Sequence, residues 1–268
     1  MIIDCFPFWK ELDLLEIRLN ELYHTVDKFV IVEASRTQTL QHKPFFFEEN
    51  KERYSKFLDK IVHVKIEEYP DNSSNLWNME NFQRNCISIG IDKLNLTDDD
   101  IILISDLDEI PRSDILNLLK QNNSFDCISF DMSFFAYFLN LKAKNRNWIG
   151  TVAVKHKTLK QYTPQYFRNI KDSLPLIQNG GWHFSWLGGY KQIHEKVHAC
   201  IEPFDKSKLP SLQEFQFYFE NFTKNENKFF IHLENLSKQE TEFGKINIDN
   251  TFPKFILDYE FNYKDYIL

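Results

Sequence analysis

The chain has 268 residues, of which 43% are hydrophobic and 26% are charged, as in a soluble globular protein that can build a sizeable core. Its formal net charge of -7 argues against a nucleic-acid partner, because binding a phosphate backbone requires a basic face. The first residues lack the basic lead of a signal peptide, and no apolar run approaches the roughly 20 residues that span a bilayer. We therefore expect a cytoplasmic protein without a transmembrane segment.

The first hundred residues alternate between short apolar runs and amphipathic segments. The pattern predicts strands at 1–6, 28–34, 60–66 and 101–104, and helices at 11–22, 48–58 and 77–94. In the helix 11–22, leucines form the inward stripe and charged residues, including Arg18, lie off it. Strands and helices that alternate at this spacing indicate βαβ units, a mostly parallel sheet and right-handed crossovers.

The second half of the chain has a less regular pattern. Adjoining strands are expected at 125–131 and 134–139, a polar turn at 142–147, a further strand at 151–156, and helices at 193–200 and 211–221. From residue 222 onward no clear period emerges, and we expect a packed tail. These segments predict a mixed extension of the parallel sheet.

Cysteine and glycine usage excludes several common sites. The four cysteines lack C-x-x-C spacing, so neither a zinc knuckle nor a disulfide framework is indicated. Neither G-x-G-x-x-G nor G-x-x-x-x-G-K-[ST] occurs, so a nucleotide would be held without a glycine cradle. Four of the seven glycines fall between residues 180 and 189, which marks a segment where the backbone can approach a ligand closely.

The stretch from residue 100 to residue 111 organises the rest of the chain. Four aliphatic residues predict a buried strand, and Asp106, Asp108 and Glu109 crowd its carboxyl end. In an extended backbone Asp106 and Asp108 project to the same side, and their mutual repulsion favours a bound divalent cation. The alternative is that these carboxylates only cap a helix that begins at Pro111.

Five other side chains are candidates for contacts with a ligand. His183 can complete a metal site, and Trp182 or Trp186 can stack on a sugar ring; the alternatives are a core histidine and core tryptophans. Arg84 matches the oxygens of a phosphate, unless it is an ordinary surface arginine. Lys196 can neutralise a leaving diphosphate, although a solvated helix face explains it about as well.

Carboxylates supply the other candidates. Glu33 ends the second strand, at the edge of the sheet where cofactors bind. Asp131, Glu195 and Glu109 are the candidates for a catalytic base that takes a proton from a hydroxyl group. The sequence does not choose among these three.

Six short strings make the chain similar to glycosyltransferase family 17 over roughly residues 4 to 200. They are Phe6-Pro7-Phe8 with residues 11–22, residues 26–34, Lys43-Pro44 with Phe47, Gln83-Arg84-Asn85, residues 105–111 (Ser-Asp-Leu-Asp-Glu-Ile-Pro) and residues 181–186 (Gly-Trp-His-Phe-Ser-Trp). Each string is short, but six in the same order are specific. This is the family of the bisecting β-1,4-N-acetylglucosaminyltransferase that acts on the core mannose of N-glycans.

The resemblance implies an α/β fold of the GT-A type, a mixed and mostly parallel Rossmann-like sheet flanked by helices. It implies a catalytic domain over residues 1–200 and a helical or irregular C-terminal extension over residues 201–268, packed on the same domain. The implied reaction is metal-dependent transfer of a sugar, N-acetylglucosamine by analogy, from a UDP-sugar to a carbohydrate hydroxyl with inversion at the anomeric carbon. We expect no counterpart of the animal enzyme's N-terminal membrane anchor, which leaves the Golgi setting and the N-glycan acceptor open.

The resemblance also assigns roles to residues. Asp106-Leu107-Asp108 matches the family-type DxD motif, with Asp108 on Mn²⁺ (or Mg²⁺) and Asp106 on the ribose or the metal. His183 is then a further metal ligand, and Glu33, Arg84, Asp106, Trp182 and Lys196 contact the donor. Two other functions also fit the residues: a phosphatase of the haloacid dehalogenase type, and a protein that binds sugars or nucleotides without turnover.

Overall fold

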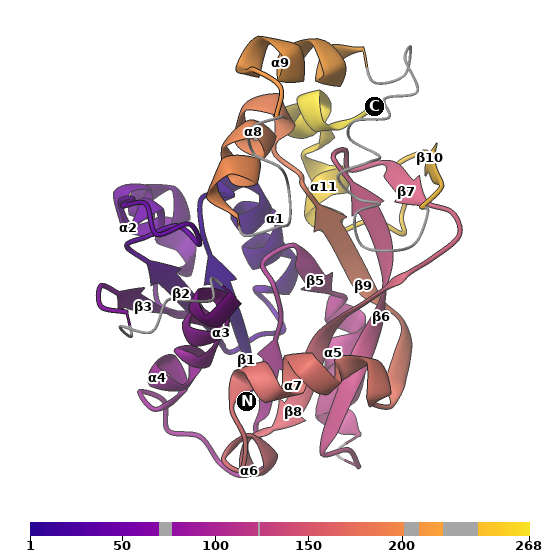
Figure 1. The fold of residues 1–268 in the computed structure, drawn as a ribbon. Coiled ribbons are helices and arrows are strands. Elements are labelled where there is room, and N and C mark those ends of the chain that lie inside the picture. The colour runs from indigo at the N-terminus through magenta and orange to yellow at the C-terminus, as the bar shows by residue number, and fades with distance from the viewer. Residues whose placement is uncertain (70–76, 123, 201–208, 222–240) are drawn as a thin grey trace.

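The computed structural model describes residues 1–69, 77–122, 124–200, 209–221 and 241–268. Within these ranges ten strands form one sheet (Figure 1). The strands are β1 (Ile2–Phe8), β2 (Lys28–Ala34), β3 (Ile61–Ile66), β4 (Ile101–Ile104), β5 (Glu109–Pro111), β6 (Cys127–Ala136), β7 (Leu141–Ala143), β8 (Trp148–Lys155), β9 (Leu176–Ser185) and β10 (Phe243–Lys245).

The α-helices of the described residues are α1 (Leu12–Leu22), α2 (Phe46–Glu49), α3 (Trp77–Asn85), α4 (Ile87–Ile91), α5 (Ser113–Gln121), α6 (His156–Leu159), α7 (Pro164–Ile170), α8 (Gly189–Ala199), α9 (Leu212–Glu220) and α11 (Lys254–Asp258). Three short 3-10 helices accompany them: η1 (Lys51–Phe57), η2 (Lys171–Ser173) and η4 (Glu260–Tyr266). No helix within the described ranges is both long enough and apolar enough to cross a bilayer.

The sheet is mixed and mostly parallel, which confirms the expected fold class. Its main path runs β10-β7-β6-β8-β4-β1-β2-β3, and β9 pairs with both β5 and β6. β3, β2, β1 and β4 are parallel neighbours, and among the described strands only β5, β7 and β8 run against the common direction. The parallel half was predicted correctly because its apolar runs are covered on both faces.

Two layers of apolar side chains cover the two faces of the sheet. On one face, leucines of α1 and α5 pack with β1 and β4 and with the C-terminal helix α11. On the other face, residues of α4, α6 and α7 pack on β2, β4 and β8. Figure 1 shows the same arrangement, with the sheet between these two groups of helices. The rigid carboxyl ends of the parallel strands are therefore available to position a site.

Several predicted elements have different limits in the structure. The helix expected at 48–58 is the short α2 followed by η1, and the helix expected at 77–94 breaks near Cys86 into α3 and α4. The two strands expected at 125–131 and 134–139 are one continuous strand, β6, and the turn expected at 142–147 begins with β7. Pro111 ends β5 rather than starting the helix α5.

The Gly-rich segment is mainly a strand. Gly180 and Gly181 lie in β9, where a Cβ on Gly181 would stand 2.2 Å from the carbonyl oxygen of Ile110 in β5. This close approach of two backbones explains the glycine. After β9 the chain turns sharply, with φ of 57° at Trp186 and 135° at Gly188, and enters α8.

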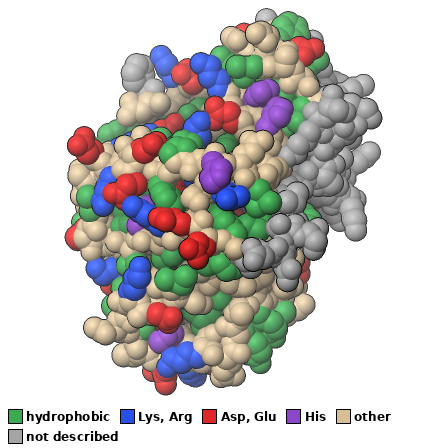
Figure 2. Space-filling model, turned by 60° about the vertical axis from the view of Figure 1, so that its left-hand side comes forward, with side chains coloured by type: hydrophobic (Ala, Val, Ile, Leu, Met, Phe, Trp, Pro, Cys, Tyr) green, Lys and Arg blue, Asp and Glu red, His purple; other side chains and the backbone are tan. Residues whose placement is uncertain are grey.

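The described part of the C-terminal segment packs on the rest of the protein. β10 joins the sheet beside β7, and α11 contacts α1. The predicted tail from residue 222 lies outside the described residues as far as residue 240. Figure 2 shows acidic and basic side chains interspersed over the described atoms of one face, so that face carries no continuous basic surface.

Candidate active site

A cavity of about 450 Å³ opens where the parallel strands end, and we call it the strand-end cavity. Its wall includes residues that follow β1, β2 and β4, among them Trp9, Arg36 and Asp106. Ligands of open α/β sheets bind beyond the carboxyl ends of the strands. Asp106 and Asp108 both line this cavity, so the two strongest candidates from the sequence share it.

A second cavity, of about 420 Å³, lies between α1 and the C-terminal helices α11 and η4. Its charged side chains neutralise one another, since Arg53 pairs with both Asp13 and Glu16 at 2.5 Å. None of the site residues predicted from the sequence lines it, and all of those residues lie in the described ranges. The candidate site is therefore the strand-end cavity.

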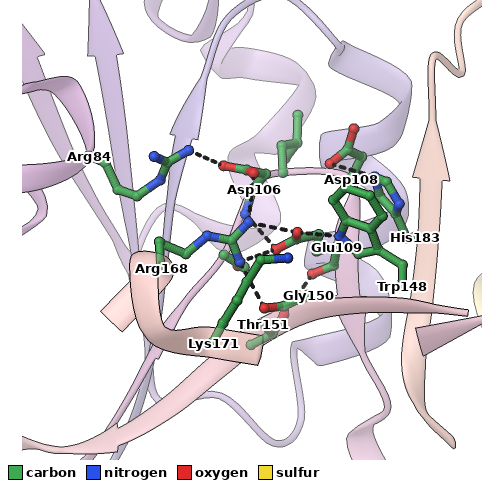
Figure 3. A network of polar contacts seen from close by, with 12 residues as sticks. Arg84, Asp106, Asp108, Glu109, Trp148, Gly150, Thr151, Arg168, Lys171 and His183 are labelled. Carbon is green, nitrogen blue, oxygen red and sulfur yellow. Dashed lines mark hydrogen bonds and ion pairs between the residues drawn. The ribbon is translucent and has the colours of Figure 1, made fainter. Parts of the chain in front are cut away.

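Asp106 lies between two arginines (Figure 3). Its Oδ1 accepts a hydrogen bond from Arg84 of α3 at 2.7 Å, and its Oδ2 accepts one from Arg168 of α7 at 2.9 Å. Burial alone would raise the pKa of Asp106, but the two guanidinium groups outweigh burial and hold this pKa well below its usual range. Asp106 is thus ionised at neutral pH, and cations of the protein itself neutralise it.

Asp108 faces a different set of groups. Its Oδ1 lies 3.6 Å from Nε2 of His183, and its Oδ2 lies 3.9 Å from Nζ of Lys196. The imidazole of His183 is buried and stacks on the rings of Phe134 and Trp148, with ring centroids 5.1 and 4.5 Å away. Both contacts of Asp108 are longer than hydrogen bonds, so this carboxylate is held less tightly than that of Asp106.

Asp108 and His183 fit a divalent cation. A carboxylate oxygen and an imidazole nitrogen are both ordinary ligands of Mn²⁺-like ions. The Nδ1 of His183 is buried without a hydrogen-bond partner, and its Nε2 faces Asp108. Among the described residues no three His, Cys, Asp or Glu side chains form a complete ligand set. A cation held by this pair would therefore need further ligands from a substrate or from water.

Glu109 is held by hydrogen bonds to its whole carboxylate group. Its carboxylate accepts two hydrogen bonds from Arg168, at 2.7 and 2.8 Å, one from the Trp148 indole at 2.8 Å and one from the backbone N–H of Asp106 at 3.0 Å. It is fully buried, and although burial would raise its pKa, Arg168 lowers that pKa. With four donors on its two oxygens and no place in the lining of the strand-end cavity, Glu109 holds the loop and is not positioned to take a proton from a bound acceptor.

Arg18 fixes the same loop from behind. Its guanidinium forms a two-point ion pair with Asp4, at 2.7 and 2.8 Å, and donates to the hydroxyl of Ser105. It also donates to the backbone carbonyls of Asp106, Leu107 and Glu109 at 2.8 to 3.0 Å. The expectation that Arg18 lies off the buried face of α1 is wrong, because its side chain is fully buried where it satisfies the loop carbonyls.

The other predicted residues lie in several places. Lys196 lines the strand-end cavity, as does Arg84. Glu33 is buried beneath the wall, where it bonds to Lys43 and His63. Trp182 points into the core and donates to the carbonyl of Thr251, because neighbouring residues of a strand face opposite sides.

The other two base candidates, Asp131 and Glu195, are also absent from the cavity lining. Asp131 is buried and accepts a hydrogen bond from Asn147 at 2.9 Å. Glu195 is exposed and pairs with Lys10. The structure thus brings together Arg84, Asp106, Asp108, His183 and Lys196 around one cavity, and it leaves Glu33, Glu109, Asp131, Trp182 and Glu195 outside the cavity lining.

Sequence reasoning missed several residues of the site. Glu11 lines the cavity where α1 begins, and of the two tryptophans that the sequence offered, Trp186 lines the cavity and Trp182 does not. Arg18 and Arg168 hold the loop from α1 and α7. The arginines have no local signal because their partners are distant in sequence.

The fold and this site define a class of protein: an open α/β protein with an ionic, ligand-sized cavity beyond the carboxyl ends of its parallel strands. The family model of glycosyltransferase family 17 matches residues 1–204. The chain therefore belongs to glycosyltransferase family 17.

Curated relatives carry the name beta-1,4-mannosyl-glycoprotein 4-beta-N-acetylglucosaminyltransferase. The rat protein is 30% identical over 225 residues, which cover 73% of this chain and 42% of the rat protein. The human protein is 31% identical over 124 residues, which cover 44% of this chain and 23% of the human protein. The chain thus spans less than half the length of these relatives.

Solved structures are similar only at a low level. Glucosyl-3-phosphoglycerate synthase from Mycobacterium tuberculosis, in complex with Mn²⁺, UDP and glucosyl-3-phosphoglycerate, is 10% identical with a TM-score of 0.39, and the match covers 74% of this chain and 78% of that one. The 4-diphosphocytidyl-2C-methyl-D-erythritol synthase from Anaerococcus prevotii is 9% identical with a TM-score of 0.40, covering 74% and 95%. Similarities at this level do not bear on the function of this chain.

Proposed function

We propose that this protein is a metal-dependent inverting glycosyltransferase that moves N-acetylglucosamine from a UDP-sugar to a hydroxyl group of a carbohydrate acceptor. Membership of glycosyltransferase family 17 and the names of the rat and human relatives support the transferase class and the sugar. The single observation that carries the site assignment is the position of Asp108 beside His183 and Lys196 on the wall of the strand-end cavity.

The charges of the cavity suit a sugar nucleotide. Arg84 and Lys196 line it from α3 and α8, and each can donate to the oxygens of a diphosphate. Asp108 and His183 would hold Mn²⁺ or Mg²⁺, which supplies positive charge next to the departing diphosphate. Asp106 keeps Arg84 and Arg168 in place, so its role in this proposal is to orient cations around the donor.

The residues beyond β2 and along α3 suit the nucleoside end of the donor. Arg36, Thr37, Gln38 and Trp77 line this part of the cavity, next to the parallel βαβ half of the sheet. Trp148 and Trp186 line the opposite part, beside β9 and α8, where their ring faces suit a sugar. The donor would thus lie across Asp106 and Asp108, with its sugar toward Trp186.

The test is turnover of UDP-sugars. Purified protein is incubated with UDP-N-acetylglucosamine, Mn²⁺ and a panel of mannose-containing glycans, and UDP release and product are measured. We expect release that depends on Mn²⁺ and is abolished in Asp108→Ala, while Asp114→Ala on the exposed start of α5 keeps full activity. Equal activity of Asp108→Ala and the native protein would refute the site, and release of phosphate from small esters without a sugar donor would favour the phosphatase alternative.

A further inference from the structure

The proposed reaction requires a group that accepts the proton of the attacking hydroxyl. In the described part of the chain, the carboxylates that line the strand-end cavity are Glu11, Glu80, Asp106 and Asp108. Glu109, Asp131 and Glu195, the candidates from the sequence, are absent from that lining. These four carboxylates are therefore the candidates for the general base, because a bound substrate can contact them.

Three of these four are engaged in other ways. Asp106 is held by Arg84 and Arg168, and Glu80 accepts hydrogen bonds from Arg84 at 2.8 Å and from Gln38 at 3.2 Å. Through Gln38, Glu80 belongs to the part of the cavity assigned to the nucleoside. Asp108 stands beside His183, where it would hold the cation. Glu11 is left.

Glu11 lies at the other part of the cavity, immediately before α1. Its side chain is buried, and its Oε1 lies 2.9 Å from Nζ of Lys196 in α8. The same ammonium lies 3.9 Å from Oδ2 of Asp108 and 5.5 Å from the centre of the Trp186 ring. Lys196 thus links Glu11 to the position where the diphosphate and the sugar would meet.

We propose that Glu11 is the general base of the transfer, and that Lys196 moves from Glu11 toward the donor diphosphate when the donor binds. This inference rests on the proposed function. In the reaction the acceptor oxygen forms a bond to the anomeric carbon as the bond from that carbon to the diphosphate oxygen breaks. The acceptor proton passes to the carboxylate of Glu11, and the electron pair of the broken bond leaves on UDP.

The movement of Lys196 would change the basicity of Glu11, which is paired with this lysine before the donor binds and loses the pairing afterwards. Without donor, burial would raise the pKa of Glu11, but Lys196 outweighs burial and lowers that pKa, which makes the carboxylate a weak base. A diphosphate beside Asp108 attracts the ammonium and leaves Glu11 less stabilised as an anion. Lys43, from the segment after β2, also faces Glu11, and the backbone N–H of Lys10 donates a hydrogen bond to Oε2 of Glu11 at 3.1 Å.

The experiment compares Glu11→Gln with Glu16→Gln, a variant within α1 whose position faces Arg53 and lies away from the strand-end cavity. Transfer rates are measured from pH 5 to 9, and the affinity for UDP with Mn²⁺ is measured by calorimetry. For Glu11→Gln we expect kcat to fall about 10²- to 10⁴-fold. Its affinity for UDP should stay within about threefold of the native value, and the acid limb of the pH profile should disappear. Glu16→Gln should behave as the native protein.

Each outcome separates this proposal from the function on which it rests. A native protein that transfers no sugar would overturn the proposed function itself. A native protein that transfers sugar, together with a Glu11→Gln variant that keeps kcat within about fivefold, would overturn the assignment of Glu11 alone. A loss of kcat matched by an equal loss of UDP affinity, or one that leaves the acid limb intact, would show a structural role and would also overturn it.

Discussion

Arg18 holds the loop that carries Asp106 and Asp108, and its replacement gives a quantitative test of that structure. In Arg18→Met the apolar stem is kept while the ion pair with Asp4 and the hydrogen bonds to three carbonyls are lost. Removing one partner of a buried ion pair costs about 3 to 5 kcal/mol, because the other charge is left buried and unpaired. Total stabilities are about 5 to 15 kcal/mol, so the loss is a large part of the whole.

The assay is urea unfolding of the native protein and the variant, with the free energy of unfolding extrapolated to water. Arg53→Met is the control, since Arg53 is partly exposed and its surface pairs with Asp13 and Glu16 are worth about 0 to 1 kcal/mol. Adding Asp4→Leu to Arg18→Met should recover part of the loss, because no unpaired charge then remains. A loss below about 1 kcal/mol in Arg18→Met would refute the reasoning.

Two further predictions concern the same region. The pKa of Asp106 is lowered in the folded protein, so its ion pairs contribute stability above its ordinary pKa of about 4, and that contribution is lost as pH falls below this value. The difference in unfolding free energy between the native protein and Asp106→Asn should therefore be constant from pH 7 to 5 and shrink in more acid solution. A difference that grows with acid would contradict this. Gly181→Ala should lower stability by about 1 to 3 kcal/mol, since its Cβ meets the backbone of β5. In Gly244→Ala the Cβ meets only the flexible end of Lys144, so that variant should unfold at the native urea concentration, and equal effects of the two would argue against the close approach of β5 and β9.

The sequence predicted the parallel half of the sheet well, because its signals are local. The apolar run 101–104 and the alternation of strands with amphipathic segments suffice to place β4 and its carboxylates at one edge. The sequence also predicted an unusual backbone in the glycine-rich segment that contains residues 181–186. Its glycines were interpreted as freedom to approach a ligand, whereas Gly181 is required by the neighbouring strand β5.

What the sequence could not predict depends on contacts between distant segments. Arg18 looks like a surface residue of an amphipathic helix, and only the fold places three unsatisfied carbonyls and Asp4 around it. Arg168 is likewise far in sequence from Asp106 and Glu109. The repulsion of the neighbouring carboxylates suggested a metal, and for Asp106 the structure instead supplies two guanidinium groups.

The affinity for UDP with and without Mn²⁺ tests the central claim most directly. Calorimetric titration in Mn²⁺ and in excess chelator should show that the ion tightens UDP binding to the native protein, and that Asp108→Ala loses this gain while keeping the weaker affinity measured in chelator. The same tightening in Asp108→Ala as in the native protein, or a native affinity that does not respond to Mn²⁺, would contradict the account.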